Sequence, residues 1–346
     1  MSKTYRTLLT AALLLALVVV SLGAYVRLSD AGLGCPDWPG CYGQLIGVPE
    51  QAHEVNAARS AFPTKPVEAP KAWKEMIHRY AAGTLGLAIA GLAVMAWRQR
   101  KRRAPWLETT LVAVVLAQAL LGMLTVTKLL KPVIVTSHLL GGMTTLAILT
   151  LLWLGGRRPA RHGTRTPAGL RLLASAALAS VFVQIALGGW VSSNYAAAIC
   201  SDFPTCQGSW WPEMDSHHAF TLDRELGATA SGALLPAAAL TAIHWSHRLF
   251  AGLVLLIVGS FGLRILGQPG GRRYGLGLLV ALLVQISLGI ANVSLQLPLP
   301  LAVAHNAGAA LLLCATLAAV AHVFKGDESR GRLAAGGFAR RFGIAR

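Results

Sequence analysis

The chain has 346 residues, of which 54% are hydrophobic and only 13% are charged, and its mean hydropathy is +0.56. Soluble domains carry about 25% charged residues, so this composition excludes an ordinary soluble protein, and a disordered chain is never so apolar. The 31 Lys and Arg residues outnumber the 14 Asp and Glu residues, for a net charge of +17. These basic residues form short clusters between long apolar runs, which excludes a soluble nucleic-acid-binding protein. We therefore expect an all-α polytopic membrane protein without a nucleic-acid partner.

Eight apolar runs are each long enough to cross a bilayer, for which a helix needs about 20 residues. The first run follows Lys3 and Arg6, as in a secretory signal, but its length favours a helix that is retained. In chain order, the expected spans are residues 8–28, 72–97, 105–127, 133–154, 170–193, 239–265, 275–295 and 301–324.

The basic residues predict the orientation of these spans, because Lys and Arg gather in cytoplasmic connections. The acidic residues fall mainly in the two long loops 29–71 and 194–238, which we expect to be extracytoplasmic. Both termini and the connectors 98–103 and 155–169 then face the cytoplasm. The clusters on that side are Arg98, Arg100, Lys101, Arg102 and Arg103; Arg157, Arg158, Arg161, Arg165 and Arg171; Arg264, Arg272 and Arg273; and Lys325, Arg330, Arg332, Arg340, Arg341 and Arg346.

The second half of the chain repeats the first. Leu22-Gly23-Ala24-Tyr25-Val26 and Leu187-Gly188-Gly189-Trp190-Val191 are offset by 165 residues, as are the segments 35–41 and 200–206, each bounded by two cysteines. His78-Arg79 and His247-Arg248 are offset by 169, and His138 and His305 by 167. An even number of spans in each unit leaves both units facing the same way, with a pseudo-twofold axis along the membrane normal. We expect two tandem four-helix units, residues 1–160 and 161–325, followed by a basic tail, residues 326–346.

Four histidines lie inside spans, where ionisable residues are rare and usually functional. His78 and His138 belong to the second and fourth spans, and His247 and His305 to the equivalent spans of the second unit. Two histidines facing each other in a four-helix bundle are typical of a bis-histidine heme site, since imidazole is an axial ligand of heme iron. A lone histidine that only hydrogen-bonds a neighbouring helix is the alternative, but a duplicated pair at matched depth favours two heme sites.

Charged neighbours distinguish the two candidate sites. Arg79 and Arg248 each follow a histidine and are candidates for binding heme propionates. Glu75 lies one helical turn before His78, whereas the equivalent position in the second half is His244. A carboxylate beside one site only suggests that this site performs proton-transfer chemistry and that the other holds a permanent heme. An interfacial ion pair of Glu75 with a nearby basic side chain is the alternative interpretation.

The loop cysteines form two pairs, Cys35 with Cys41 and Cys200 with Cys206, in loops where oxidising conditions permit disulfides. Pairing between the two loops is an open alternative. A structural role and a redox role for these cysteines also stay open at this stage.

These residues together resemble the heme A synthase family of bacterial and mitochondrial membranes, over nearly all of the eight-span core. The motifs that carry the resemblance are Gly23-Ala24-Tyr25-Val26-Arg27-Leu28, Gly32-Leu33-Gly34-Cys35-Pro36-Asp37-Trp38-Pro39 with Cys41, Glu75-Met76-Ile77-His78-Arg79, and His138, His247 and His305. The pair Cys35 and Cys41 is similar to the bacterial form with a disulfide in the first outer loop. The second pair, Cys200 and Cys206, occurs in some members only.

The resemblance implies an oxidoreductase of the bacterial inner membrane that oxidises the C8 methyl of heme O to a formyl group by successive hydroxylations. It implies that His78 and His138 hold the heme O substrate and heme A product in the first unit, with Glu75 essential to the chemistry. It implies that His247 and His305 ligate a heme b cofactor that passes electrons. Expected partners are a heme O synthase, an electron donor not identified by the sequence, and the lipid bilayer; a homo-oligomer is compatible with the sequence.

Two other functions compete with this interpretation. A diheme b-type electron carrier explains the four histidines but assigns no role to Glu75. A heme transporter or cytochrome c assembly factor would be expected to carry a Trp-rich outer segment. The pair Trp210-Trp211 resembles such a segment only weakly.

Overall fold

The computed structural model describes residues 2–101, 104–155 and 166–341, with side chains described as far as Phe324. The regular structure of these residues is helical, without a strand. Eight of the helices are long and apolar enough to cross a membrane, which confirms the predicted number of spans. Their bounds are α1 Lys3–Leu28, α3 Ala69–Arg98, α4 Trp106–Thr127, α5 Pro132–Gly155, α6 Ala168–Ser193, α8 Ala237–Leu266, α9 Arg272–Ser294 and α10 Leu299–Arg341.

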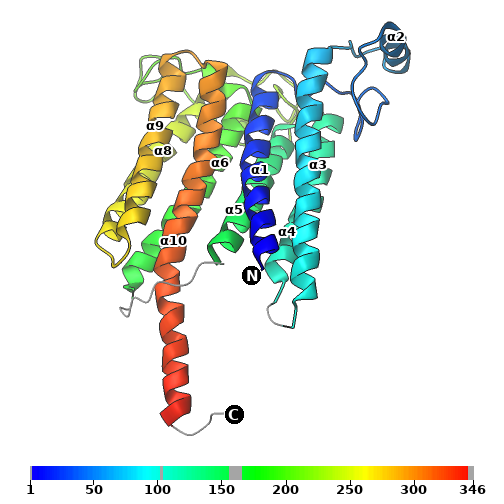
Figure 1. The fold of residues 1–346 in the computed structure, drawn as a ribbon. Coiled ribbons are helices and arrows are strands. Elements are labelled where there is room, and N and C mark those ends of the chain that lie inside the picture. The colour runs from blue at the N-terminus through cyan, green and yellow to red at the C-terminus, as the bar shows by residue number, and fades with distance from the viewer. Residues whose placement is uncertain (1, 102–103, 156–165, 342–346) are drawn as a thin grey trace.

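The last predicted span is confirmed, since the candidate span Leu299–Phe324 ends at the predicted residue. The helix α10 itself continues to Arg341, so most of the expected tail extends α10 away from the bundle (Figure 1). Several other predictions lie outside the described residues. They concern the basic residues Arg102, Arg103, Arg157, Arg158, Arg161, Arg165 and Arg346 and the boundary between residues 160 and 161.

Each half of the chain forms a closed ring of four helices. In the first ring α1 packs on α3, α3 on α4, α4 on α5, and α5 returns to α1; in the second, α6, α8, α9 and α10 repeat this order. Consequently α3 lies diagonally across its bundle from α5, and α8 diagonally across from α10. The bundles meet where α5 and α10 pack on each other and on α6 and α1.

Contacts between equivalent residues mark the relation between the two bundles. The Arg27 guanidinium donates to the carbonyl of Ser192, 165 positions later, at 2.9 Å. The Tyr195 hydroxyl donates to the carboxylate of Asp30, again 165 positions away, at 3.2 Å. Residues at equivalent positions of two symmetry-related units can contact each other only near the symmetry axis that relates the units. The predicted pseudo-twofold arrangement of two four-helix bundles is therefore present, with its axis running between the bundles.

The two ends of the bundle pair differ in character. Both long loops, with the short helices α2 Ala52–Ala61 and α7 Ser216–Ala219 and the 3-10 turn η1 Ala196–Ala198, lie at one end, here called the loop end. The N-terminus and the C-terminal extension of α10 lie toward the other (Figure 1). The even number of spans explains why both termini are on one side.

Side-chain packing also changes along the bundles. In α5 most residues of 133–142 are partly accessible, whereas most of those from Met143 onward are buried. In α10 no residue of 299–309 is buried, and burial begins at Ala310, which is equivalent to Met143. The main hydrophobic core includes Leu9, Ile89, Leu146, Val258 and Leu313 and belongs largely to the half away from the loops. The loop-end half of each bundle is thus less densely filled, at the level of the four histidines.

Candidate active site

Each of the four histidines lies against a glycine of a neighbouring helix. A methyl group built on Gly23 of α1 would lie 3.0 Å from Cε1 of His78, and one built on Gly122 of α4 would lie 3.4 Å from Cε1 of His138. Absence of a side chain at these positions lets an imidazole approach the helix backbone closely.

The second bundle repeats this arrangement. A methyl group on Gly188 of α6 would lie 3.1 Å from Cε1 of His247, and one on Gly289 of α9 would lie 3.1 Å from Cε1 of His305. Each of these four glycines follows a leucine in the sequence, and each leaves room for one imidazole.

The histidines form two pairs, one inside each bundle. His78 and His138 project from the diagonal helices α3 and α5 and are close enough to interact electrostatically, and the same holds for His247 and His305 on α8 and α10. All four side chains are partly accessible although four helices surround each pair. The structure thus brings together the residues that the sequence paired.

The environments of the ring nitrogens differ between the bundles. Among the described residues, Nδ1 of His78 and Nδ1 of His138 are buried and have no hydrogen-bond partner. In the second bundle the side-chain amide of Gln184 lies 3.1 Å from Nδ1 of His247, and that of Gln285 lies 3.3 Å from Nε2 of His305.

These glutamines were not predicted as site residues. Gln285 and its equivalent Gln118, 167 positions earlier, lie against the equivalent glycines Gly308 and Gly141. Gln184 has no polar equivalent, because Val19 occupies that position in the first half. Both glutamines could have been recognised as candidate site residues, because polar side chains inside apolar spans are rare and usually functional.

Glu75 is buried beside the first histidine pair, with 5% of its surface exposed. One carboxylate oxygen pairs with the guanidinium of Arg79 at 2.5 Å, and the other accepts a hydrogen bond from the backbone N–H of Cys35 at 3.0 Å. The proposed ion pair with a neighbouring basic residue therefore exists, but it is buried rather than interfacial. It connects the carboxylate directly to the disulfide loop.

Arg79 and Arg248 hold the two loops onto their helices. Arg79 donates to the carbonyls of Asp37, at 3.0 Å, and Pro39, at 3.1 Å, besides pairing with Glu75. Arg248 donates at 2.8 Å to the carbonyl of Asp202 and at 2.7 Å to that of Cys200. Both arginines were predicted as candidates for binding heme propionates. In the structure, N–H groups of both guanidiniums donate hydrogen bonds to loop carbonyls.

The second bundle has no carboxylate at the position of Glu75. There His244 is 5% exposed, and its Nε2 accepts a hydrogen bond from Nε of Arg248 at 3.2 Å. The Arg–loop anchor is common to both halves, whereas the acid is confined to the first.

The cysteines pair within each loop and not between loops. Cys35–Cys41 and Cys200–Cys206 are disulfides with Cα–Cα distances of 4.8 Å and 4.7 Å. Each loop also has a cis X–Pro bond, Trp38–Pro39 or Phe203–Pro204.

An aspartate stabilises the turn that follows each disulfide. Asp37 accepts from the backbone N–H of Tyr42 at 2.6 Å and from that of Gly43 at 2.8 Å. Asp202 accepts from the backbone N–H of Gln207 at 2.7 Å and from that of Gly208 at 3.0 Å. The repeat therefore extends to the architecture of the loops.

A small residue lets the first loop reach Glu75. A methyl group on Gly34 would lie 2.7 Å from the carbonyl carbon and oxygen of Lys71, at the start of α3. The equivalent position in the second loop is Ile199. The first loop can therefore lie directly on α3, which brings the N–H of Cys35 to the carboxylate.

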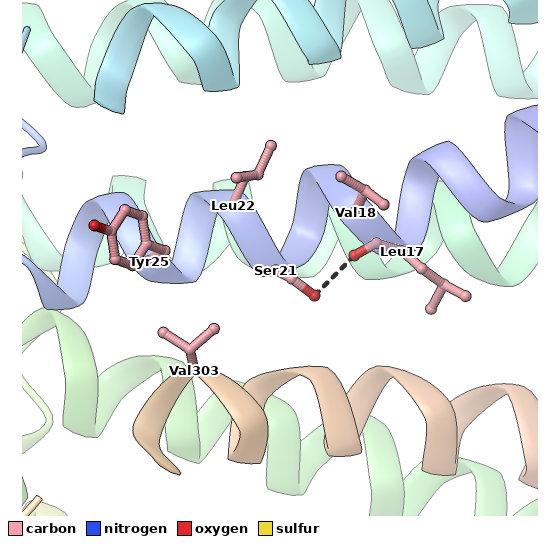
Figure 2. A pocket seen from close by; sticks show the side chains of 6 residues that line it. All are labelled: Leu17, Val18, Ser21, Leu22, Tyr25 and Val303. Carbon is pink, nitrogen blue, oxygen red and sulfur yellow. Dashed lines mark hydrogen bonds between the residues drawn. The ribbon is translucent and has the colours of Figure 1, made fainter. Parts of the chain in front are cut away.

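An open apolar groove runs between α1 and α10, outside both bundles (Figure 2). The Ser21 hydroxyl in it is bonded to the carbonyl of Leu17 at 2.9 Å, so it is not a free polar group. The groove is lined by Leu17, Val18, Ser21, Leu22, Tyr25 and Val303. It lacks the acid and imidazole groups that the histidine sites provide.

The residues present fit a heme in each bundle. Each bundle carries two imidazoles on its diagonal helices, the side chains at that level are partly accessible, and Nδ1 of His78 and Nδ1 of His138 are buried without a partner. Groups of three or more candidate ligands (His, Cys, Asp or Glu) that would hold a bare metal ion are absent from the described part of the chain. Pairs of histidines alone match the axial ligation of heme iron.

Known proteins resemble this chain over nearly its whole length. Residues 6–317 match a protein family described as cytochrome oxidase assembly protein. The heme A synthase of Shewanella oneidensis is 44% identical over 88% of this chain and 92% of its own length. The heme A synthase of Caulobacter vibrioides is 27% identical over 90% of this chain and 92% of its own length. The chain therefore belongs to the cytochrome oxidase assembly family that includes the heme A synthases.

Proposed function

We propose that this protein is an oxidoreductase of a bacterial inner membrane that converts heme O to heme A. The reaction oxidises the C8 methyl of heme O to a formyl group by successive hydroxylations. The family membership supports this activity, since relatives over nearly the whole chain are heme A synthases.

The observation that carries the proposal is the buried carboxylate of Glu75, one turn from His78 and present in one bundle only. We assign His78 and His138 to the heme substrate and Glu75 to proton transfer near the methyl group that is oxidised. The N–H of Cys35 and the guanidinium of Arg79 orient the carboxylate. A permanent electron carrier with two equivalent hemes has no need for such a group.

The second bundle suits a resident heme b. His247 and His305 would ligate its iron, and the amides of Gln184 and Gln285 would restrain the two rings. When bound, this heme supplies an iron centre that accepts and donates single electrons. Side-chain amides beside both rings favour retention of this heme. Nδ1 of His78 and Nδ1 of His138 have no such partner among the residues that the structure describes, which suits a substrate that enters and leaves.

Arg79 and Arg248 stay our candidates for contacting heme propionates, because each follows a histidine ligand in sequence. Their loop-carbonyl bonds already occupy donors. A propionate would share the guanidinium with the loop or displace one carbonyl. The disulfide loops would then lie next to the propionate edge of each heme.

We further propose that both termini are cytoplasmic and that the loop end, with its disulfides, faces the oxidising side of the membrane. A heme O synthase would supply the substrate, and an electron donor would serve the second bundle. The first unit, residues 1–160, would carry the substrate site, the second, residues 161–325, the heme b site, and residues 326–346 would form the cytoplasmic tail.

Extraction of hemes from the purified protein tests the proposal. After co-expression with a heme O source, we expect heme O or heme A together with heme b. In His247→Ala heme b should be lost, and in the matched His78→Ala variant heme b should be retained while substrate heme is lost. Heme b alone at both sites would favour the diheme carrier, and the opposite losses in the two variants would reverse the assignment of the halves.

A further inference from the structure

Each disulfide loop exposes two large apolar side chains just after its second cysteine. In the first loop Leu45 is 73% exposed and Ile46 is 84% exposed. In the second loop Trp210 and Trp211, each 165 positions later, are 68% and 74% exposed. Side chains of this kind are costly to leave in water, and here they occur in pairs at equivalent positions of both halves.

The first pair lies beside the outward-facing stripe of α3. Exposed residues recur along α3 at the three- and four-residue spacing of one helix face, and the apolar ones among them mark a surface that faces lipid. These are Ile77, Tyr80, Leu87 and Val94.

A hydrogen bond holds the loop tip against this stripe. The backbone N–H of Gly47 donates to the hydroxyl of Tyr80 at 2.8 Å. Figure 1 shows the segment ahead of α2 lying along the outer flank of α3, below that helix's first turn. The tip therefore descends beside the bundle rather than over its mouth.

The depth of Tyr80 places this contact at a membrane boundary. Trp97 and Arg98 end α3, and Trp and Arg are typical of a membrane interface. Tyr80 lies about 18 residues before Arg98, or ~27 Å along the helix, and the hydrocarbon core is ~30 Å thick. The tyrosine hydroxyl is thus at the level where the opposite interface begins.

The second loop sits at a similar level on α8. Arg248, which binds the carbonyls of Asp202 and Cys200, lies about 18 residues before the end of α8 at Leu266, again ~27 Å along the axis. Tryptophan is the side chain that prefers the boundary between headgroups and acyl chains. Neither tip carries a charge, since residues 42–49 and 207–212 contain no Lys, Arg, Asp or Glu.

We propose that the two disulfide loops are anchored in the bilayer itself, with Leu45–Ile46 and Trp210–Trp211 inserted at the headgroup–acyl boundary of the leaflet at the loop end. Each loop is then fixed on two sides, by lipid at its tip and by Arg79 or Arg248 at its base. This anchoring keeps the loops beside the histidine pairs. It is independent of which heme occupies each bundle.

Site-directed spin labelling of the full-length protein in phosphatidylcholine–phosphatidylglycerol vesicles tests the proposal. In a Cys314→Ala background, which removes the only cysteine outside the two disulfides, Ile46→Cys and Trp210→Cys carry the label. Ser60→Cys on α2, an exposed residue of the same outer loop, is the matched control. Labelling without reductant, followed by mass spectrometry, verifies that both disulfides stay intact.

We expect the labels at positions 46 and 210 to be at least about 5-fold less accessible than the label at position 60 to a water-soluble nickel chelate, and more accessible to oxygen. Equal chelate accessibility at positions 46 and 60 would overturn the proposal. Protection in native membranes but not in pure lipid vesicles would also overturn it, because a protein partner would then cover the tips. Circular dichroism of each variant confirms that the helices remain folded.

Discussion

The two halves of the protein share a scaffold and differ in the buried residue one turn before a shared arginine. In both, an arginine on the second helix of the unit binds carbonyls of a disulfide loop. One turn before that arginine, the first half has Glu75, which reaches the N–H of Cys35, and the second has His244, which accepts from Arg248. Loop anchoring is therefore a property of the repeat, whereas the link between loop and carboxylate belongs to the first half alone.

Under the proposed function, this difference lets a duplicated bundle divide two tasks. Seating a histidine pair requires glycines opposite the rings, and both halves have them. Chemistry beside a heme requires a proton-transferring group held in one orientation, and only the first half combines Glu75 with a loop that approaches closely enough to hold it. Exchanging features between the halves should therefore separate binding from catalysis.

The largest effect is expected at the position where the halves differ. Glu75→Gln keeps the shape of the side chain but removes its charge and its capacity to transfer a proton. We expect heme A formation to fall by a factor of about 100 or more, with heme b content unchanged. Pigment analysis of membranes after co-expression with a heme O source measures both quantities.

His244→Gln is the control for that variant. It changes the equivalent position of the second half, where we assign no proton transfer, so heme A formation should change by less than about 3-fold. Comparable losses in the two variants would contradict a division of tasks between the halves.

The arginines test the shared scaffold. Arg79→Ala leaves the buried carboxylate of Glu75 without its partner, and breaking a buried ion pair in this way costs about 3–5 kcal/mol. Arg248→Ala removes hydrogen bonds to loop carbonyls but leaves no buried carboxylate without its partner. We therefore expect a smaller loss of folding stability, of about 1–3 kcal/mol. Thermal unfolding in detergent, followed by circular dichroism, compares the two. A larger loss for Arg248→Ala would show that the Glu75 pair contributes little.

Gly34 tests the close approach of the first loop. Gly34→Ala places a methyl group 2.7 Å from backbone atoms of Lys71, so the loop must move and the N–H of Cys35 must leave Glu75. We expect about a 10-fold fall in heme A formation, with heme b retained. Ile199→Ala at the equivalent position is the control and should leave conversion near that of the unaltered protein. Normal conversion by Gly34→Ala would mean that the Cys35 contact is dispensable.

The smallest effect on the protein is expected at the turn that follows the Cys200–Cys206 disulfide, where Asp202 accepts hydrogen bonds. Hydrogen bonds from the Thr205 hydroxyl and the N–H groups of Gly208 and Gln207 hold the pKa of Asp202 at about 2, below its usual 3.8. A carboxyl whose pKa is depressed by folding stabilises the folded loop at pH values above 3.8, and this stabilisation is lost as the pH falls toward 2.

Acid titration of the fluorescence of Trp210 and Trp211, with the other tryptophans replaced by phenylalanine, measures this transition. Thr205→Ala should move it to higher pH, because the largest contribution to the lowered pKa is gone. An unchanged midpoint would show that the backbone N–H groups alone set the pKa of Asp202.

Local sequence signals predicted much of this molecule. Apolar run length predicted all eight spans, because a span must satisfy its backbone hydrogen bonds internally and cover them with apolar side chains. The internal offsets predicted the pairing of His78 with His138 and of His247 with His305. The contact of Cys35 with Glu75 joins residues 40 positions apart, and no local pattern encodes such a distance.

The surplus of positive charge, the eight spans, the repeat and the four histidines follow from the sequence by itself, since each depends on composition, period or spacing. Tertiary structure decided what the charged side chains do. Arg79 and Arg248 bind loop carbonyls, the disulfides close within their own loops, and the first loop lies on α3 where Gly34 leaves room. The physical reason is that long loops fold back onto helices through steric fit and hydrogen-bond geometry, which depend on every neighbouring element at once.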